Sequence, residues 1–188
     1  MNPICRLSDN TKRYLEQFYC ILDEMTAAMT GAELTESISC DFMIQMIPHH
    51  RAAVKMSENL LLYTTFLPLQ NLAQNIIREQ NKSIKQMQAI LPCCSQLCNC
   101  IQDQCLYSRR TGQIMDTMFQ EMENAGETNC INSNFIREMI PHHQGAIRMS
   151  ENALHYSICP ELIPILETII SSQKKGVREM ERLLRCIG

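Results

Sequence analysis

Apolar residues recur every three or four positions along almost the whole chain, a spacing typical of amphipathic helices. A first helix is predicted near residues 14–29, a second from Asp41, its expected N-cap, to Tyr63, and a third from Pro68 to Leu91. No segment shows the alternating pattern of a strand. The chain is therefore predicted to be all-α.

The same helical pattern occurs twice. The segment DFMIQMIPHHRAAVKMSENLL at 41–61 returns as NFIREMIPHHQGAIRMSENAL at 134–154, an offset of 134 − 41 = 93 residues. About a third of the positions compared at this offset are identical, which indicates an old duplication. At 188 residues the chain suits one hydrophobic core. We expect a single domain, 1–188, with repeat one at 5–93, a cysteine-rich linker at 92–105 and repeat two at 98–186, each repeat carrying three helices.

Four of the five histidines lie in the two copies of this segment. On a helix that turns about 100° per residue, both members of each pair fall on the apolar side. The fifth, His155, has Leu62 as its counterpart and is expected on the surface. A lone inward histidine is usually a packed core residue, whereas a repeated pair within a repeated methionine frame favours metal binding.

Ten of the thirteen methionines form five pairs separated by 93 residues. Elsewhere the two copies exchange core residues freely, as Val54 does with Ile147. Methionine used only as flexible filler would have drifted in the same way, so its retention indicates a role for the sulfur. The candidate metal ligands are His49, His50, Met46, Met56, Met87, Met25 and Met29 in repeat one, and His142, His143, Met139, Met149, Met180, Met118 and Met122 in repeat two.

Thioether and imidazole donors together favour copper, especially Cu(I), over zinc or iron. Neighbouring histidines project about 100° apart, so each repeat has room for more than one ion.

Gln80 and Gln173 lie within apolar stripes, and a buried amide needs a partner. We expect each to accept a hydrogen bond from an inward histidine ring and so support that ligand. Pro48 and Pro141 lie in mid-helix, where a bend is either tolerated or aims the histidines.

The cysteines are many but odd in number, at eleven. No signal-peptide pattern is visible at the start, so a reducing, cytoplasmic location is expected, with thiols favoured over a disulfide framework. Cys98 and Cys100 form a Cys-x-Cys pair that suits Cu(I) or zinc. Two further pairs match between the repeats and suit either bridges or a shared thiolate cluster, without assigned partners: Cys5 with Cys98, and Cys93 with Cys186.

The formal net charge is −3, and acidic and basic residues are intermixed. This distribution provides no basic stripe for nucleic acid and no polybasic patch for a membrane surface. No run approaches the roughly 18 apolar residues of a membrane span. Metal ions are the expected partners, and a homo-oligomer or a metal-delivery partner remains open.

The motif FMxxMIPHHxxAxxMSEN, followed by Q-x6-M, resembles the bacterial family known as domain of unknown function 305. The resemblance covers both repeats. It implies a ferritin-like four-helix bundle made from the second and third helices of each repeat, with an extra N-terminal helix in each. Some members are linked to copper binding and tolerance, which implies ligand roles for the histidine pairs and the methionines that frame them. Most relatives look secreted, in contrast to the location expected for this chain.

The expected function is copper sequestration, buffering or tolerance without catalysis. A ferritin-like metal-dependent oxidase is the main alternative, but the Glu and Glu-x-x-His pattern of di-iron bundles is missing from the predicted inward faces. The other alternative is a structural bundle in which the histidines and methionines only pack.

Overall fold

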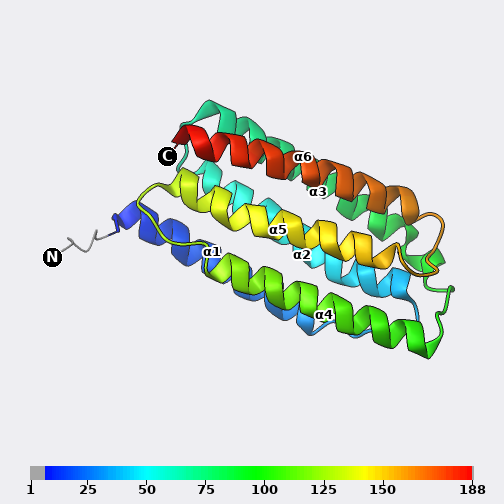
Figure 1. Cartoon of the computed structure of the whole chain (residues 1–188). Coiled ribbons are helices and arrows are strands. Elements are labelled where there is room, and N and C mark those ends of the chain that lie inside the picture. Colours follow the sequence, from blue (N-terminus) through cyan, green and yellow to red (C-terminus); the bar gives the residue numbers. More distant parts are fainter. Residues whose placement is uncertain (1–6, 188) are drawn as a thin grey trace.

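The computed structural model describes residues 7–187, and this part of the chain contains helices and no strands (Figure 1). The all-α fold class is therefore confirmed. The helices are α1 (Asp9–Thr30), α2 (Ile38–Leu61), α3 (Leu67–Cys94), α4 (Ile101–Glu123), α5 (Ile131–Ala153) and α6 (Ile163–Ile187).

The six helices form three layers of two (Figure 1). Helices α2 and α5 pack against each other in the middle, α3 and α6 cover one side, and α1 and α4 cover the other. Helices α2, α3, α5 and α6 make the expected four-helix bundle, and α1 and α4 are the additional N-terminal helices. Because the middle layer is covered on both sides, α2 and α5 are buried around most of their circumference, polar residues included.

The start of α2 differs from the prediction. Ser37 is the N-cap, and its hydroxyl accepts a hydrogen bond from the Cys40 backbone. Asp41 lies one turn inside the helix, where it accepts from the backbone N–H and hydroxyl of Thr35 at 2.7 and 2.9 Å. The Asp41 carboxylate therefore stabilises the loop before α2 and does not cap the helix.

The third helix also differs, because it continues through Pro92 to Cys94. Much of the predicted linker is therefore helical. Helices α2 and α5 likewise continue through Pro48 and Pro141.

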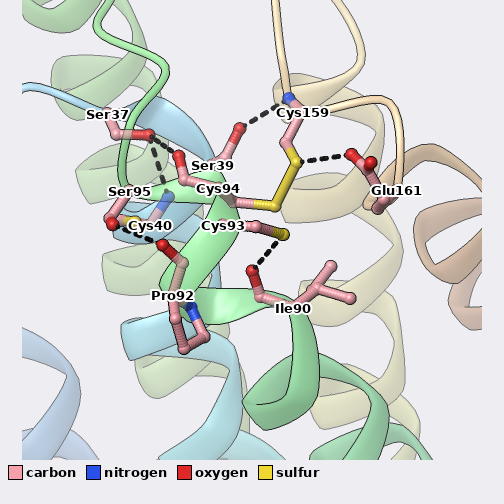
Figure 2. Close-up of a disulfide and its surroundings, with 10 residues drawn as sticks. All are labelled: Ser37, Ser39, Cys40, Ile90, Pro92, Cys93, Cys94, Ser95, Cys159 and Glu161. Carbon is pink, nitrogen blue, oxygen red and sulfur yellow. Dashed lines mark hydrogen bonds between the residues drawn. A yellow bond between two sulfur atoms is a disulfide. The ribbon is translucent and has the colours of Figure 1, made fainter.

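A disulfide between Cys94 and Cys159 joins the end of α3 to the segment before α6 (Figure 2). The residues 93 positions away are Ile187 and Phe66, so comparison of the repeats gave no sign of this bridge. The other eight cysteines among residues 7–187 are free. Cys93 and Cys186 are therefore not bridged, and neither is Cys98, whose matched Cys5 lies outside the described residues.

Within residues 7–187, no helix combines the length and apolar content needed to cross a membrane.

Candidate metal centre

His49 and His142 meet where α2 packs against α5. Their rings stack with centroids 3.7 Å apart and an angle of 28° between the planes. The Nε2 atom of each lies 3.2 Å from the backbone carbonyl oxygen of the other. A carbonyl only accepts, so each Nε2 must carry the proton and each Nδ1 must be the unprotonated nitrogen. The contact between the repeats therefore fixes a tautomer with a free lone pair on Nδ1.

His50 and His143 lie beside this pair and reach toward the outer helices α3 and α6. The Nε2 atom of His50 is 3.1 Å from the Ser83 hydroxyl on α3. His143 instead packs over Gly176 on α6, where an added Cβ would lie only 2.9 Å from Cδ2 of the ring. Ser83 and Gly176 are equivalent positions, since 176 − 83 = 93. The His50 ring is therefore positioned by the Ser83 hydroxyl, whereas the His143 ring has room because Gly176 has no side chain.

All four histidines are buried, and burial is the main cause that lowers each pKa. The pKa falls to about 3 for His50 and to about 4 for His142. For His49 and His143 it falls well below 6.5, and neighbouring histidines lower it further. For His143 the Met139 carbonyl acts in the opposite direction. The four rings are therefore neutral at physiological pH, which is the form that binds metals.

The centre contains several buried polar atoms without hydrogen-bond partners among the described residues. They include Nδ1 of all four histidines and Oε1 of both Gln80 and Gln173. The predicted hydrogen bond from a histidine ring to either glutamine oxygen is therefore absent, although both amides are buried as expected. Each unpaired buried polar atom costs about 1–3 kcal/mol. A bound cation would give the Nδ1 lone pairs of His49 and His142 the partner that the protein does not provide.

All ten repeated methionines are almost completely buried. They come from every layer: the outer helices α1 and α4 carry four, the middle helices carry four, and α3 and α6 carry one each. Met118 of α4 packs directly on α5 at Gly145, two residues after His143, where an added Cβ would overlap its sulfur. The structure thus places the methionine frame in the core that contains the histidines.

The geometry also limits which metals fit. Among residues 7–187, one cluster gathers at least three histidine, cysteine or carboxylate ligand atoms within 4.8 Å of one another, and it does not include these histidines. The centre therefore lacks the three-imidazole or imidazole–carboxylate arrangement of zinc and di-iron sites. The other donor atoms in the core around the histidines include the methionine thioethers, backbone oxygens and the Gln80 and Gln173 amide oxygens, and among these the thioethers favour soft ions.

Glu138 on α5 is a buried carboxyl that the sequence analysis missed. It is 3% exposed, and its Oε2 accepts a 2.5 Å hydrogen bond from the hydroxyl of Tyr14. Burial raises its pKa to about 8. Inward-facing carboxyls are therefore present, at Glu138 and at Asp41, which is 1% exposed. Glu138 precedes His142 by four residues, which differs from the Glu-x-x-His spacing of di-iron bundles. The available signal was the four-residue spacing between Glu138 and His142, which places both on one face of α5.

The predicted thiolate pair, Cys98 and Cys100, lies on the surface. Both side chains are exposed, and Cys100 is the N-cap residue of α4. Neither belongs to the one described cluster of ligand atoms, which instead contains Cys93, Cys94, Cys159 and Glu161.

The family described as domain of unknown function 305 (DUF305) matches the chain over residues 21–91 and 39–184. The chain belongs to this family. No curated protein matches the sequence.

Solved structures show the same fold. The Cu(II)-bound form of CopM has 27% identity and a TM-score of 0.60, covering 80% of this chain and 97% of CopM. The Ag-bound form, obtained by soaking, has 26% identity and a TM-score of 0.59, covering 82% and 97%. A DUF305 fragment from Deinococcus radiodurans has 25% identity and a TM-score of 0.57, covering 78% and 95%. The all-helical bundle is thus shared with CopM, which has been solved in copper-bound and silver-bound forms, and with the Deinococcus radiodurans fragment.

Proposed function

We propose that this chain binds copper, principally as Cu(I), in the buried histidine–methionine core and serves in copper sequestration, buffering or tolerance. The observation that carries the proposal is the set of four neutral histidines whose Nδ1 atoms have no partner in the described structure. For His49 and His142 the hydrogen bonds between the repeats leave Nδ1 as the unprotonated nitrogen. The methionines that share this core supply soft thioether ligands.

The relatives support the same metal class. CopM has been solved with Cu(II) and with Ag. Silver as Ag(I) has the same charge as Cu(I) and the same preference for soft ligands, so the pair fits a core rich in thioethers. Histidine suits both Cu(I) and Cu(II), which lets one centre hold copper across its redox states.

A metal-dependent oxidase is the second candidate, and the observation that favours it is Glu138, one turn before His142 on α5. However, the raised pKa keeps the Glu138 carboxyl largely protonated at neutral pH, and its Oε2 already accepts a hydrogen bond from the Tyr14 hydroxyl. Oxygen uptake on addition of Fe(II) or Cu(I) would support the oxidase. We therefore propose a binding protein rather than an enzyme.

The test is titration with Cu(I), in competition with a chromophoric chelator, of protein whose free thiols have been alkylated, so that the histidine–methionine core is the site measured. His49→Ala/His142→Ala should weaken Cu(I) binding at least about 100-fold, since it removes ligands rather than their supports. The exposed His155→Ala is the matched control and should leave binding unchanged. Unaltered affinity in the double variant, with the fold verified by circular dichroism, would exclude these histidines as ligands.

A second pair of variants distinguishes metal binding from packing. Met46→Leu/Met139→Leu nearly conserves side-chain volume, so stability should change by less than about 1.5 kcal/mol. Copper affinity should fall nevertheless, because leucine has no sulfur. If both stability and affinity are retained, these two methionines serve the core alone.

A further inference from the structure

Three cysteine sulfurs and one carboxylate meet far from the histidine pairs, at the end of α3. One ligand atom each from Cys93, Cys94, Cys159 and Glu161 lies within 4.8 Å of the others (Figure 2). Cys94 and Cys159 are buried and bridged, whereas Cys93 and Glu161 are exposed. The cluster is therefore open to solvent on one side and anchored in the protein on the other.

The two exposed members already point at the bridge. In Figure 2 the Cys93 side chain lies beside the disulfide, and its thiol donates to the Ile90 carbonyl at 2.9 Å. Glu161 Oε2 lies 3.0 Å from the Cys159 sulfur. A bridged sulfur carries no hydrogen, so this contact can become a thiol–carboxylate hydrogen bond only after the bridge is reduced.

The backbone on each side of the bridge is held independently of the sulfurs. The Cys159 backbone N–H donates to the Ser39 hydroxyl at 2.9 Å, and the Ser37 hydroxyl donates to the Cys94 carbonyl at 3.1 Å. Both serines belong to the start of α2. Cleavage of the disulfide therefore leaves the two cysteines positioned near each other.

We propose that reduction of the Cys94–Cys159 bridge creates a Zn(II) site formed by Cys93, Cys94, Cys159 and Glu161. A dithiol reductant supplies two electrons and two protons, the S–S bond breaks to give two thiols, and the reductant becomes a disulfide. Zinc then displaces one proton from each of the three thiols and binds the thiolates and the ionised carboxylate.

The ligand set and the spacing both suit zinc. Thiolate and carboxylate are standard zinc ligands, and structural zinc is four-coordinate. Sulfurs about 2.3 Å from a tetrahedral ion lie about 3.8 Å apart, so ligand atoms within 4.8 Å need only small side-chain shifts. A three-coordinate Cu(I) thiolate site would have no use for Glu161. While the bridge is intact, two of the three sulfurs are not thiolates, so the redox state controls the site.

The experiment uses the full chain, reduced with excess dithiol and freed of it by anaerobic gel filtration. Co(II) serves as the spectroscopic probe, because thiolate ligands give a cobalt charge-transfer band in the near ultraviolet that histidine and methionine sites do not. The reduced protein should bind one equivalent of Co(II) with this band, and Zn(II) should displace it. The oxidised protein should not show the band.

Cys93→Ser should lower the band by at least about a third, since one of three thiolates is lost, and weaken Zn(II) binding at least about 10-fold. Glu161→Gln should weaken Zn(II) binding while keeping the band. Cys186→Ser is the matched control, because Cys186 is the exposed equivalent of Cys93 in repeat two and should leave both readouts unchanged. Three results would overturn the site: no band after reduction, an equal band in Cys93→Ser, or unchanged Zn(II) affinity in Glu161→Gln. The band reports thiolates alone, so its outcome is independent of the Cu(I) titration at the histidines.

Discussion

His50 and His143 occupy equivalent positions in the two repeats, yet their surroundings differ. Around His50 the adjoining cavity is only about 20 Å³, and Ser83 holds the ring. Around His143 a cavity of about 310 Å³ opens between α3 and α6, and the position facing the ring is Gly176. Duplication has retained the candidate ligands while the access to them has diverged. Ligand identity and ligand accessibility are thus set by different residues.

A second difference lies one turn earlier, on the middle helices. Position 45 is glutamine in repeat one, and its equivalent is Glu138 in repeat two. Glu138 accepts from Tyr14, whereas Tyr107, the equivalent of Tyr14, has no hydrogen-bond partner for its hydroxyl among the described residues. The repeats therefore differ in ionisation as well as in access.

The largest expected effect is acid unfolding, and it should involve both repeats. Between pH 6.5 and 4 the unfolded chain binds protons on histidines that stay neutral in the folded state, so stability falls as pH falls. At pH 4.5 this amounts to about 2 kcal/mol for each of His50 and His142, whose pKa values are about 3 and 4. Urea unfolding at pH 7 and pH 4.5 measures the loss. His50→Gln/His143→Gln should flatten the pH dependence, and equal stability at the two pH values in the wild type would contradict the prediction.

Glu138→Gln should have the next largest effect, with the opposite pH dependence. The folded pKa of about 8 lies above the usual value of 4.5, so the unfolded chain releases this proton first and stability falls as pH rises from 4.5 to 8. Glutamine cannot ionise but still accepts from Tyr14, so the variant should gain about 2–4 kcal/mol at pH 8 and much less at pH 5. Gln45→Glu is the matched change in repeat one and should introduce the same penalty. A gain that is equal at both pH values would show that ionisation is not the cause.

Gly176→Ser tests the difference in access. The added side chain crowds the His143 ring, so stability should fall by about 1–3 kcal/mol. Stopped-flow Cu(I) transfer should also become several-fold slower, because the ring and the opening of the cavity are obstructed. The control Ser83→Ala removes only a hydrogen-bonding hydroxyl from His50, with a cost of about 1 kcal/mol and no change in rate. Equal rates in both variants would show that ions do not pass His143.

The smallest effect is expected from a surface ion pair that only repeat two has. Lys174 lies 2.7 Å from Glu151, and both side chains are nearly half exposed. The equivalent residues in repeat one are Asn81 and Glu58, which carry no such charge pair. Lys174→Ala should change the free energy of unfolding by less than about 1 kcal/mol. A larger change in the urea midpoint would mean that the difference between the repeats extends to their surfaces.

Much of this architecture was predictable because it depends on local periodicity. The three- and four-residue spacing gave the helices, and the offset of 93 residues gave the pairing of the two halves. Burial of the histidine pairs and the methionines followed from their helical face. The predictions that failed concern which groups meet: Asp41 as a cap, and histidine partners for Gln80 and Gln173. The thiolate pair at Cys98 and Cys100 stays a prediction.

The sequence by itself determined six amphipathic helices in two repeats, the inward direction of four histidines and the retention of ten methionines, since each depends on spacing along one helix. Only the tertiary structure decided that His49 and His142 fix each other's tautomer, that Gly176 lies against the buried His143 ring beside a cavity, and that Cys94 meets Cys159. Each of these contacts joins segments from different repeats or different helices. Their geometry depends on how the three layers pack, and no periodicity within a single helix specifies that packing.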